Sequence, residues 1–130
     1  MIRGFLSTIF VIHIGILWIG CGRSVITKSD IVYHRVEGVE LSLDLYLPRR
    51  QPTMPRPSVL VVHGGGWRQG NKVNMERVAM MLAKRGYGAV SVSHRFAPDW
   101  SFPAQLEDVQ AAVRWVRRHA DEYNIDATKI

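Results

Sequence analysis

The chain has 130 residues, of which 47% are hydrophobic and 22% are charged, a balance that fits a globular domain and excludes a largely disordered chain. The formal net charge of +6 does not indicate a nucleic-acid-binding protein, because the basic residues are scattered and acidic residues lie among them. A single cysteine excludes an intrachain disulfide and leaves too little sulfur for a zinc cluster.

Residues 1–21 have the composition of an export signal. They carry one charged side chain, Arg3, and an apolar run over residues 5–19, which is shorter than the ~20 residues that cross a bilayer. The Ile-Gly-Cys sequence ending at Cys21 resembles a bacterial lipobox, although Trp18 stands where an aliphatic residue is usual. We expect a signal peptide, a lipoprotein signal or a membrane anchor, with Cys21 as the lipidation candidate. We therefore expect the protein to be exported and to contact a membrane only through this segment or through a lipid attached to it.

Two alternatives for this segment stay open at the level of sequence. One is a secretory signal cleaved elsewhere or an anchor that is not cleaved, and the other is an apolar N-terminus with no targeting role. Residues 22–30 are polar and predict a tether between this segment and a folded domain over residues 31–130.

An antiparallel hairpin is predicted at the start of that domain. Apolar and polar residues alternate over residues 39–47, which is typical of a strand with one buried face. Residues 31–36 predict a preceding strand, and Glu37-Gly38 fits a tight turn between the two. Residues 48–57 are rich in proline and arginine and predict a surface loop.

Two strands and a helix follow. The continuous apolar run over residues 59–62 predicts a strand at residues 58–62 that is buried on both faces, and residues 89–92 predict another buried strand. Residues 73–85 predict a helix between them, closed by Gly86 in the left-handed conformation. The side chains expected on the buried side of this helix are Val78, Met81 and Leu82.

A second helix is predicted from Ala104 to about Tyr123, because apolar residues recur three and four positions apart. Its expected buried stripe is Leu106, Val109, Val113 and Val116, with Trp115 in the core beside it. Residues 125–129 predict a connector, and Ile130 is expected to begin another strand. The order of elements predicts an α/β fold, in which an antiparallel hairpin leads into a parallel sheet with helices on both faces.

One motif in this pattern points to chemistry. His63-Gly64-Gly65-Gly66-Trp67 directly follows the strand expected at residues 58–62. Three consecutive glycines cost backbone entropy, so they mark a place that does not tolerate Cβ atoms. Such a loop can turn its N–H groups toward an oxyanion that forms on a carbonyl under attack. A phosphate site or a simple tight turn is the alternative, although the loop lacks the spacings of nucleotide-binding loops.

The chain resembles α/β-hydrolase esterases of the hormone-sensitive-lipase and feruloyl or acetyl-xylan esterase type over residues 31–130. The motif at residues 63–67, the segment 86–98 and the segment 102–109 are similar to family landmarks and occur in the family's order. One departure is His94, which stands where the family usually has tyrosine. The resemblance implies the N-terminal part of an α/β-hydrolase fold, truncated before the nucleophile.

The same resemblance implies roles for the residues of the glycine motif. Gly65 and Gly66 would supply the oxyanion-hole amides, and Gly64 would allow the turn. His63 would brace the loop by hydrogen bonding rather than act as a base. Trp67 would line the acyl or alcohol side of the substrate pocket. The resemblance implies neither a metal nor an organic cofactor.

No residue of the chain is expected to be the nucleophile. The sequence contains no G-x-S-x-G pattern, which in the family would follow the strand expected from Ile130, with the acid and the histidine after it. Ser91 and Ser93 lie in or at the end of a strand without such an elbow. Arg95 and Asp108 are expected to form an internal contact between a strand end and a helix.

The resemblance implies a function for the parent protein. It would be a serine carboxylic-ester hydrolase that forms an acyl-enzyme on small acyl or aryl esters, including esters linked to polysaccharide. The chain as given would supply the oxyanion-hole loop and would be inactive alone. The alternative is a non-catalytic binding or interaction remnant of the same fold.

Overall fold

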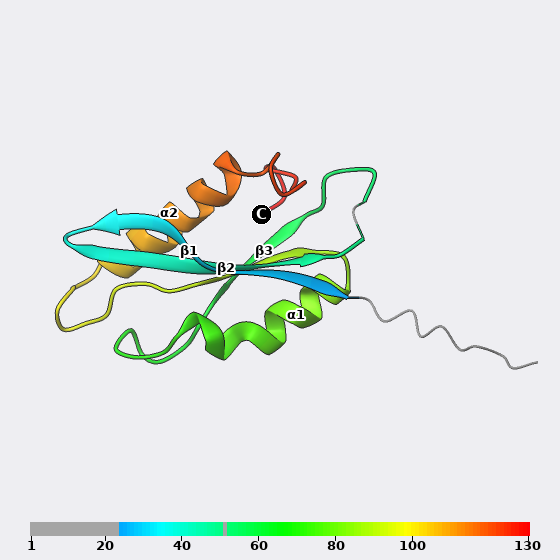
Figure 1. The fold of residues 1–130 in the computed structure, drawn as a ribbon. Coiled ribbons are helices and arrows are strands. Elements are labelled where there is room, and N and C mark those ends of the chain that lie inside the picture. The colour runs from blue at the N-terminus through cyan, green and yellow to red at the C-terminus, as the bar shows by residue number, and fades with distance from the viewer. Residues whose placement is uncertain (1–23, 51) are drawn as a thin grey trace, which may run out of the picture.

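Four strands form one sheet in the order β1-β2-β4-β3 (Figure 1). The structure is a computed structural model that describes residues 24–50 and 52–130. The strands are β1 (Val25–Val36), β2 (Val39–Pro48), β3 (Ser58–Val62) and β4 (Gly88–Val92). The helices are the 3-10 helix η1 (Lys72–Met75), α1 (Glu76–Lys84) and α2 (Ala104–Arg118). The predicted α/β class and the predicted order of elements are confirmed.

The sheet is mixed in direction. β2 pairs antiparallel with both β1 and β4, whereas β3 and β4 are parallel and place Val62 opposite Val92. After α2 the backbone returns to the outer edge of β3, where the Ser58 N–H donates to the Lys129 carbonyl at 2.9 Å. The chain therefore reaches Ile130 beside a strand edge, and a strand beginning there stays a prediction.

The first strand begins at Val25 rather than at Ile31. Residues 25–28 pair with the end of β2, so most of the expected tether is part of the sheet. This stretch is an edge strand whose side chains from Thr27 to Asp30 are exposed, and its polar sequence therefore shows no alternation. A register shift between Lys28 and Ile31 adds to the irregularity.

The sheet is covered on both faces, with α2 on one side and α1 on the other (Figure 1). The leucines of β2 and the valines of β4 pack against α2, while Tyr46 and Ala89 pack against Ala79 and Ala83 of α1. The prediction that β2 has a single buried face is therefore wrong. Its polar positions face α1, and Asp44 and Tyr46 are buried there.

The buried side of α1 differs in part from the predicted one, although Leu82 is half-buried and packs against the core as expected. Val78 and Met81 are exposed, and the buried residues are Ala79 and Ala83, whose small side chains allow the helix to lie close to the sheet. The helix ends as predicted at Gly86, which has a φ of 102°. The Gly86 N–H donates to Ala83 and the next N–H donates to Leu82, as in a Schellman motif.

The buried side of α2 is also rotated from the predicted stripe, and the helix ends at Arg118 rather than near Tyr123. Leu106 is exposed, and Val109 and Val113 are only half-buried. The nonpolar residues that α2 buries are Ala104, Ala111, Ala112, Trp115 and Val116. Trp115 is in the core as expected, because the alanines beside it leave room for the ring.

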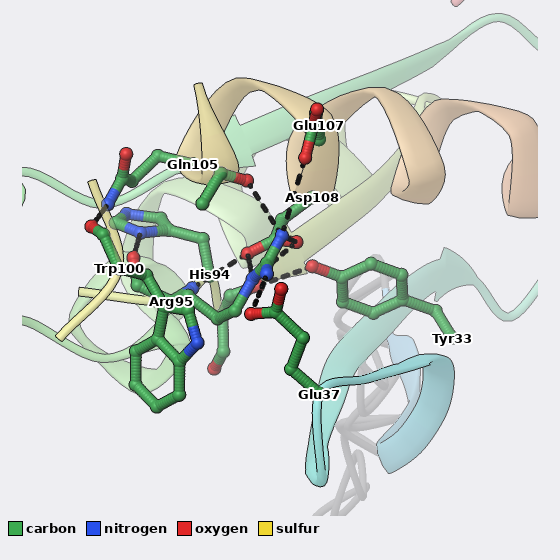
Figure 2. Close-up of polar contacts among 10 residues, drawn as sticks. Tyr33, Glu37, His94, Arg95, Trp100, Gln105, Glu107 and Asp108 are labelled. Atoms are coloured by element: carbon green, nitrogen blue, oxygen red, sulfur yellow. Dashed lines mark hydrogen bonds and ion pairs between the residues drawn. The ribbon is translucent and has the colours of Figure 1, made fainter. Parts of the chain in front are cut away.

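A buried ion pair connects the segment that follows β4 to α2, as expected for Arg95 and Asp108. Asp108 is fully buried and accepts hydrogen bonds from the Arg95 side chain at 2.9–3.1 Å and from the Arg95 backbone N–H at 2.9 Å. Figure 2 shows the guanidinium between Asp108 and Glu37, which lies in the turn between β1 and β2. The hydrogen bonds that Arg95 donates to Asp108 raise the pKa of Arg95, so the cation persists despite its burial.

We expect Asp108→Asn to lower the free energy of unfolding of the whole protein by about 3–5 kcal/mol, since it leaves the buried Arg95 charge without its main partner. Glu107→Gln on the same helix is the matched control. Its side chain is 60% exposed and lies 3.7 Å from Arg95, so we expect a loss of less than ~1 kcal/mol. Urea unfolding measures both values, and equal losses would contradict a central role for the buried pair.

Candidate active-site loop and pocket

The glycine motif leaves the carboxyl end of β3 at the edge of the sheet where β4 also ends. Residues 64–71 are exposed along their whole length within the described part of the chain. The loop is tied to the segment after β4, because the Ala97 N–H donates to the Trp67 carbonyl at 2.9 Å. In α/β sheets, ligands bind outside the carboxyl ends of the strands, so this is the edge where a site is expected.

The backbone turns sharply at three consecutive residues of the motif. Gly65, Gly66 and Trp67 have φ values of 130°, 63° and 65°, and the Arg68 N–H closes the turn on the Gly65 carbonyl at 3.2 Å. A Cβ atom at Gly65 would lie 1.8 Å from the backbone oxygen of Gln69. Gly64 has neither a positive φ nor a neighbour within 4 Å of a Cβ, so the turn comes from residues 65–67 and not from Gly64.

Several backbone donors of the loop have no acceptor in the described part of the chain, including those at the turn. Among the described residues, neither the Gly65 N–H nor the Gly66 N–H donates a hydrogen bond. Because residues 64–71 are exposed, water can meet these donors, and a ligand that binds here can replace it. Two consecutive N–H groups of this kind can bind the oxygen of a substrate on which negative charge develops.

His63 lies under this loop. It is buried, and its Nδ1 donates to the Gly64 carbonyl at 2.8 Å. Its ring stacks on His94 with centroids 4.5 Å apart, and the edge of Phe96 packs against both rings. His63, His94 and Phe96 therefore form an aromatic cluster under the loop, and the centroid of the Trp67 ring lies 5.7 Å from that of His94.

Gly70 supports the loop and was not expected from the sequence. It has a φ of 127°, and a Cβ there would lie 2.1 Å from the His63 ring and 2.6 Å from the Gly64 carbonyl. The backbone at Gly70 therefore has to pass directly over the imidazole. An isolated glycine in a polar stretch carries no sequence signal for such a contact.

An apolar pocket of about 640 Å³ opens beside the loop and includes Gly66 in its lining. The apolar side chains of its wall are Val62, Trp67, Ala97, Phe102, Leu106 and Val109. Trp67 is 59% exposed and Phe102 is 80% exposed, so both present apolar surface to a ligand. The volume is within the range of small-molecule sites.

The remaining candidate residues do not form a second site. Ser91 is fully buried and donates from its Oγ to the Lys72 carbonyl at 2.7 Å, so a substrate cannot reach it. Within residues 24–50 and 52–130 no group of three or more His, Cys, Asp or Glu side chains could hold a metal ion. In the same part of the chain no helix is long and apolar enough to span a bilayer. Cys21 and the expected signal segment lie outside the described residues.

The chain is similar in sequence and in fold to known esterases. The BD-FAE family matches residues 43–130. Over 78% of this chain, the sequence is 31% identical to the ethyl acetate hydrolase of Pseudomonas putida. Over 57% of this chain, it is 39% identical to the carboxylesterase NlhH of Mycobacterium tuberculosis. It is similar to a thermophilic esterase of Thermogutta terrifontis, with a TM-score of 0.71 and 30% identity over 85% of the chain.

The chain spans only part of each relative. It covers 33% of the Pseudomonas enzyme, 24% of the Mycobacterium enzyme and 39% of the Thermogutta structure. Further structures of the Thermogutta esterase hold propionate or are phosphorylated by paraoxon, with TM-scores of 0.71 and 0.73.

We expect Gly70→Ala to destabilise the whole protein by about 1–3 kcal/mol more than Gly38→Ala, because only at position 70 does the added methyl meet buried atoms. Gly38 has a φ of 77° with nothing within 4 Å of its Cβ, so its substitution isolates the cost of the left-handed conformation, roughly 1–2 kcal/mol. Thermal melting compares the two variants. Equal shifts in Tm would show that the contact with His63 is unimportant.

Proposed function

We propose, from the premise that the chain belongs to the BD-FAE family of α/β-hydrolase esterases, that the whole protein is a serine carboxylic-ester hydrolase. The observation that carries the proposal is the pair of unpaired N–H groups at Gly65 and Gly66. They lie at the carboxyl edge of the sheet beside an apolar pocket. A loop that served only as a turn would not need both features together.

In the proposed reaction, a serine outside residues 1–130 attacks the ester carbonyl, and a histidine takes its proton while an acid orients the histidine. The carbonyl oxygen becomes negative in the tetrahedral intermediate. The N–H groups of Gly65 and Gly66 donate to this oxygen, together with the amide after the serine. The alcohol leaves, and water then releases the acid from the acyl-enzyme by the same steps.

The contribution of this chain is a rigid arrangement of donors. The loop is bent by its own positive φ angles and supported from below by the His63–His94 stack. Donors that are in place before the reaction need no reorganisation when charge develops. One such donor contributes about 100- to 1,000-fold in rate.

The pocket supports small acyl or aryl esters as substrates. Its wall is mainly apolar, and Trp67 and Phe102 offer aromatic surface for an alkyl or aryl group. Gln105 also lines the pocket, but its side-chain Nε2 donates to the Trp100 carbonyl at 2.7 Å and so does not point a donor at the substrate. The Thermogutta esterase, whose structure holds propionate, supports a short acyl group. The proposed substrates include small acyl or aryl groups that are esterified to a polysaccharide.

We expect Gly66→Ala in the whole protein to lower kcat by about 100-fold and to leave KM within about threefold, because alanine disfavours a φ of 63° and a donor then turns away from the oxyanion. Gly66 is a better test than Gly65, since a Cβ at Gly66 meets no atom within 4 Å. Hydrolysis of p-nitrophenyl acetate gives both constants.

Gly64→Ala is the matched control for this experiment. Gly64 has an ordinary φ and open space around its Cβ, so we expect its kcat to stay within about threefold of the wild type. Melting curves establish that all variants fold. If folded Gly66→Ala retains the wild-type kcat, the glycine motif is only a turn.

We also propose that the protein is exported and that Cys21 becomes its lipidated N-terminus. The apolar run that ends in Gly20-Cys21 supports this proposal. We expect mass spectrometry after bacterial expression to find a diacylated Cys21 as the first residue, and Cys21→Ala to abolish the modification. An intact Met1 on unmodified protein would contradict export, and cleavage at another residue would contradict lipidation alone.

A further inference from the structure

A second buried ion pair lies on the α1 side of the sheet. It joins Asp44 of β2 to Lys72, the residue at which the glycine loop ends. Lys72 is the first residue of η1 and is 6% exposed. Its Nζ donates to Asp44 at 2.6 Å and to Asp30 at 2.8 Å. Burial lowers the pKa of Lys72, but hydrogen bonds with the two carboxylates outweigh it and raise the pKa overall. Lys72 is therefore a buried cation.

The backbone of Lys72 is held as firmly as its side chain. The Ser91 Oγ donates to the Lys72 carbonyl at 2.7 Å, and Ser91 is fully buried in β4. Asp44 and Ser91 are directly opposite each other in the pairing of β2 with β4. Two adjacent strands therefore hold Lys72: β2 contacts its side chain through Asp44, and β4 contacts its carbonyl through Ser91.

The glycine loop itself has few bonds of this kind. Within the described residues, three backbone hydrogen bonds involve its exposed part, from Arg68 to Gly65, from Ala97 to Trp67 and, at its end, from Asn74 to Asn71. The position of its N–H groups therefore depends on how its two ends are held. His63 holds the start, and Lys72 holds the end.

A buried ion pair is an inefficient way to stabilise a fold, because well-packed apolar residues of similar volume stabilise as much or more. What the pair adds is direction, since the ammonium group has to point at the buried Asp44 carboxylate. Oxyanion donors act only when they are held within about 0.5 Å of the productive geometry. A directional contact at the end of the loop meets this requirement, and an apolar contact does not.

We propose that Lys72, held by Asp44 and Ser91, is a positioning residue that fixes the end of the glycine loop and thereby the direction of the Gly65 and Gly66 N–H groups. The assignment rests on the proposed esterase function. Lys72 touches no substrate in this account and acts only through the loop.

The test uses the whole protein with Lys72→Met and Asp44→Leu combined, which removes both charges and leaves no unpaired ion buried. We expect Tm within a few degrees of the wild type, kcat lower by about 10- to 100-fold, and KM within about twofold. Glycine-selective ¹⁵N labelling adds a readout that needs no turnover, because we expect the Gly65 and Gly66 amide resonances to shift. Ser91→Ala, a small change in the same contact, should shift the same resonances and lower kcat by about 3- to 10-fold.

Two control variants separate positioning from stability. Asp30→Asn removes the second ion pair of Lys72, which is exposed because the Asp30 side chain is 80% exposed. We expect this variant to keep kcat within twofold of the wild type. Val116→Ala removes core packing on the opposite face of the sheet and should lower Tm without changing kcat.

Folded variants of both designs with the wild-type kcat and unchanged glycine resonances would overturn the assignment. If the double variant does not fold, Ser91→Ala alone decides by the same two readouts. A wild-type protein without esterase turnover would instead refute the proposed function. In that case the glycine resonances still test the positioning role: a shift supports it and unchanged resonances contradict it.

Discussion

The buried contact between Arg95 and Asp108 is the interaction on which the candidate site depends. It joins the segment that follows β4 to α2, and the same guanidinium reaches Glu37 in the hairpin turn, so three elements meet at one cation. Because its hydrogen bonds are satisfied, the buried charge is tolerated. The chain beyond Arg95 then turns back to the glycine loop, where the Ala97 N–H donates to the Trp67 carbonyl.

The glycine loop combines an exposed surface with an imposed backbone. Two glycines adopt positive φ at little cost, but Trp67 does so with a side chain, and this kind of strain persists only where surrounding contacts hold it. The Trp67 carbonyl accepts a hydrogen bond from the Ala97 N–H, and the Trp67 ring packs against His94. The strained residue is also the aromatic wall of the pocket, so conformation and ligand surface are linked at one position.

Features with a local origin were predictable from the sequence. The existence and order of the strands and helices, the stop at Gly86 and the position of the glycine motif follow from periodicity and from glycine chemistry, whereas the start of β1 and the end of α2 do not. Features that depend on distant partners were not. Asp44 has the polar pattern of a solvent-facing residue, and its burial is made possible by hydrogen bonds from the Asp30 N–H and from the Lys72 side chain at the start of η1. Leu106 has helical core spacing, but it lines a pocket formed with Trp67 rather than the core.

The central claim is that the Gly65 and Gly66 N–H groups bind the oxyanion of an ester under attack. A crystal structure of the whole protein after reaction with paraoxon tests it most directly, because the phosphoryl oxygen of the adduct takes the place of that oxyanion. We expect a covalent adduct on a serine, with its oxygen about 2.7–3.1 Å from the Gly65 and Gly66 nitrogens. An adduct whose oxygen faces away from the glycine loop, or a protein that paraoxon does not modify, would contradict the account.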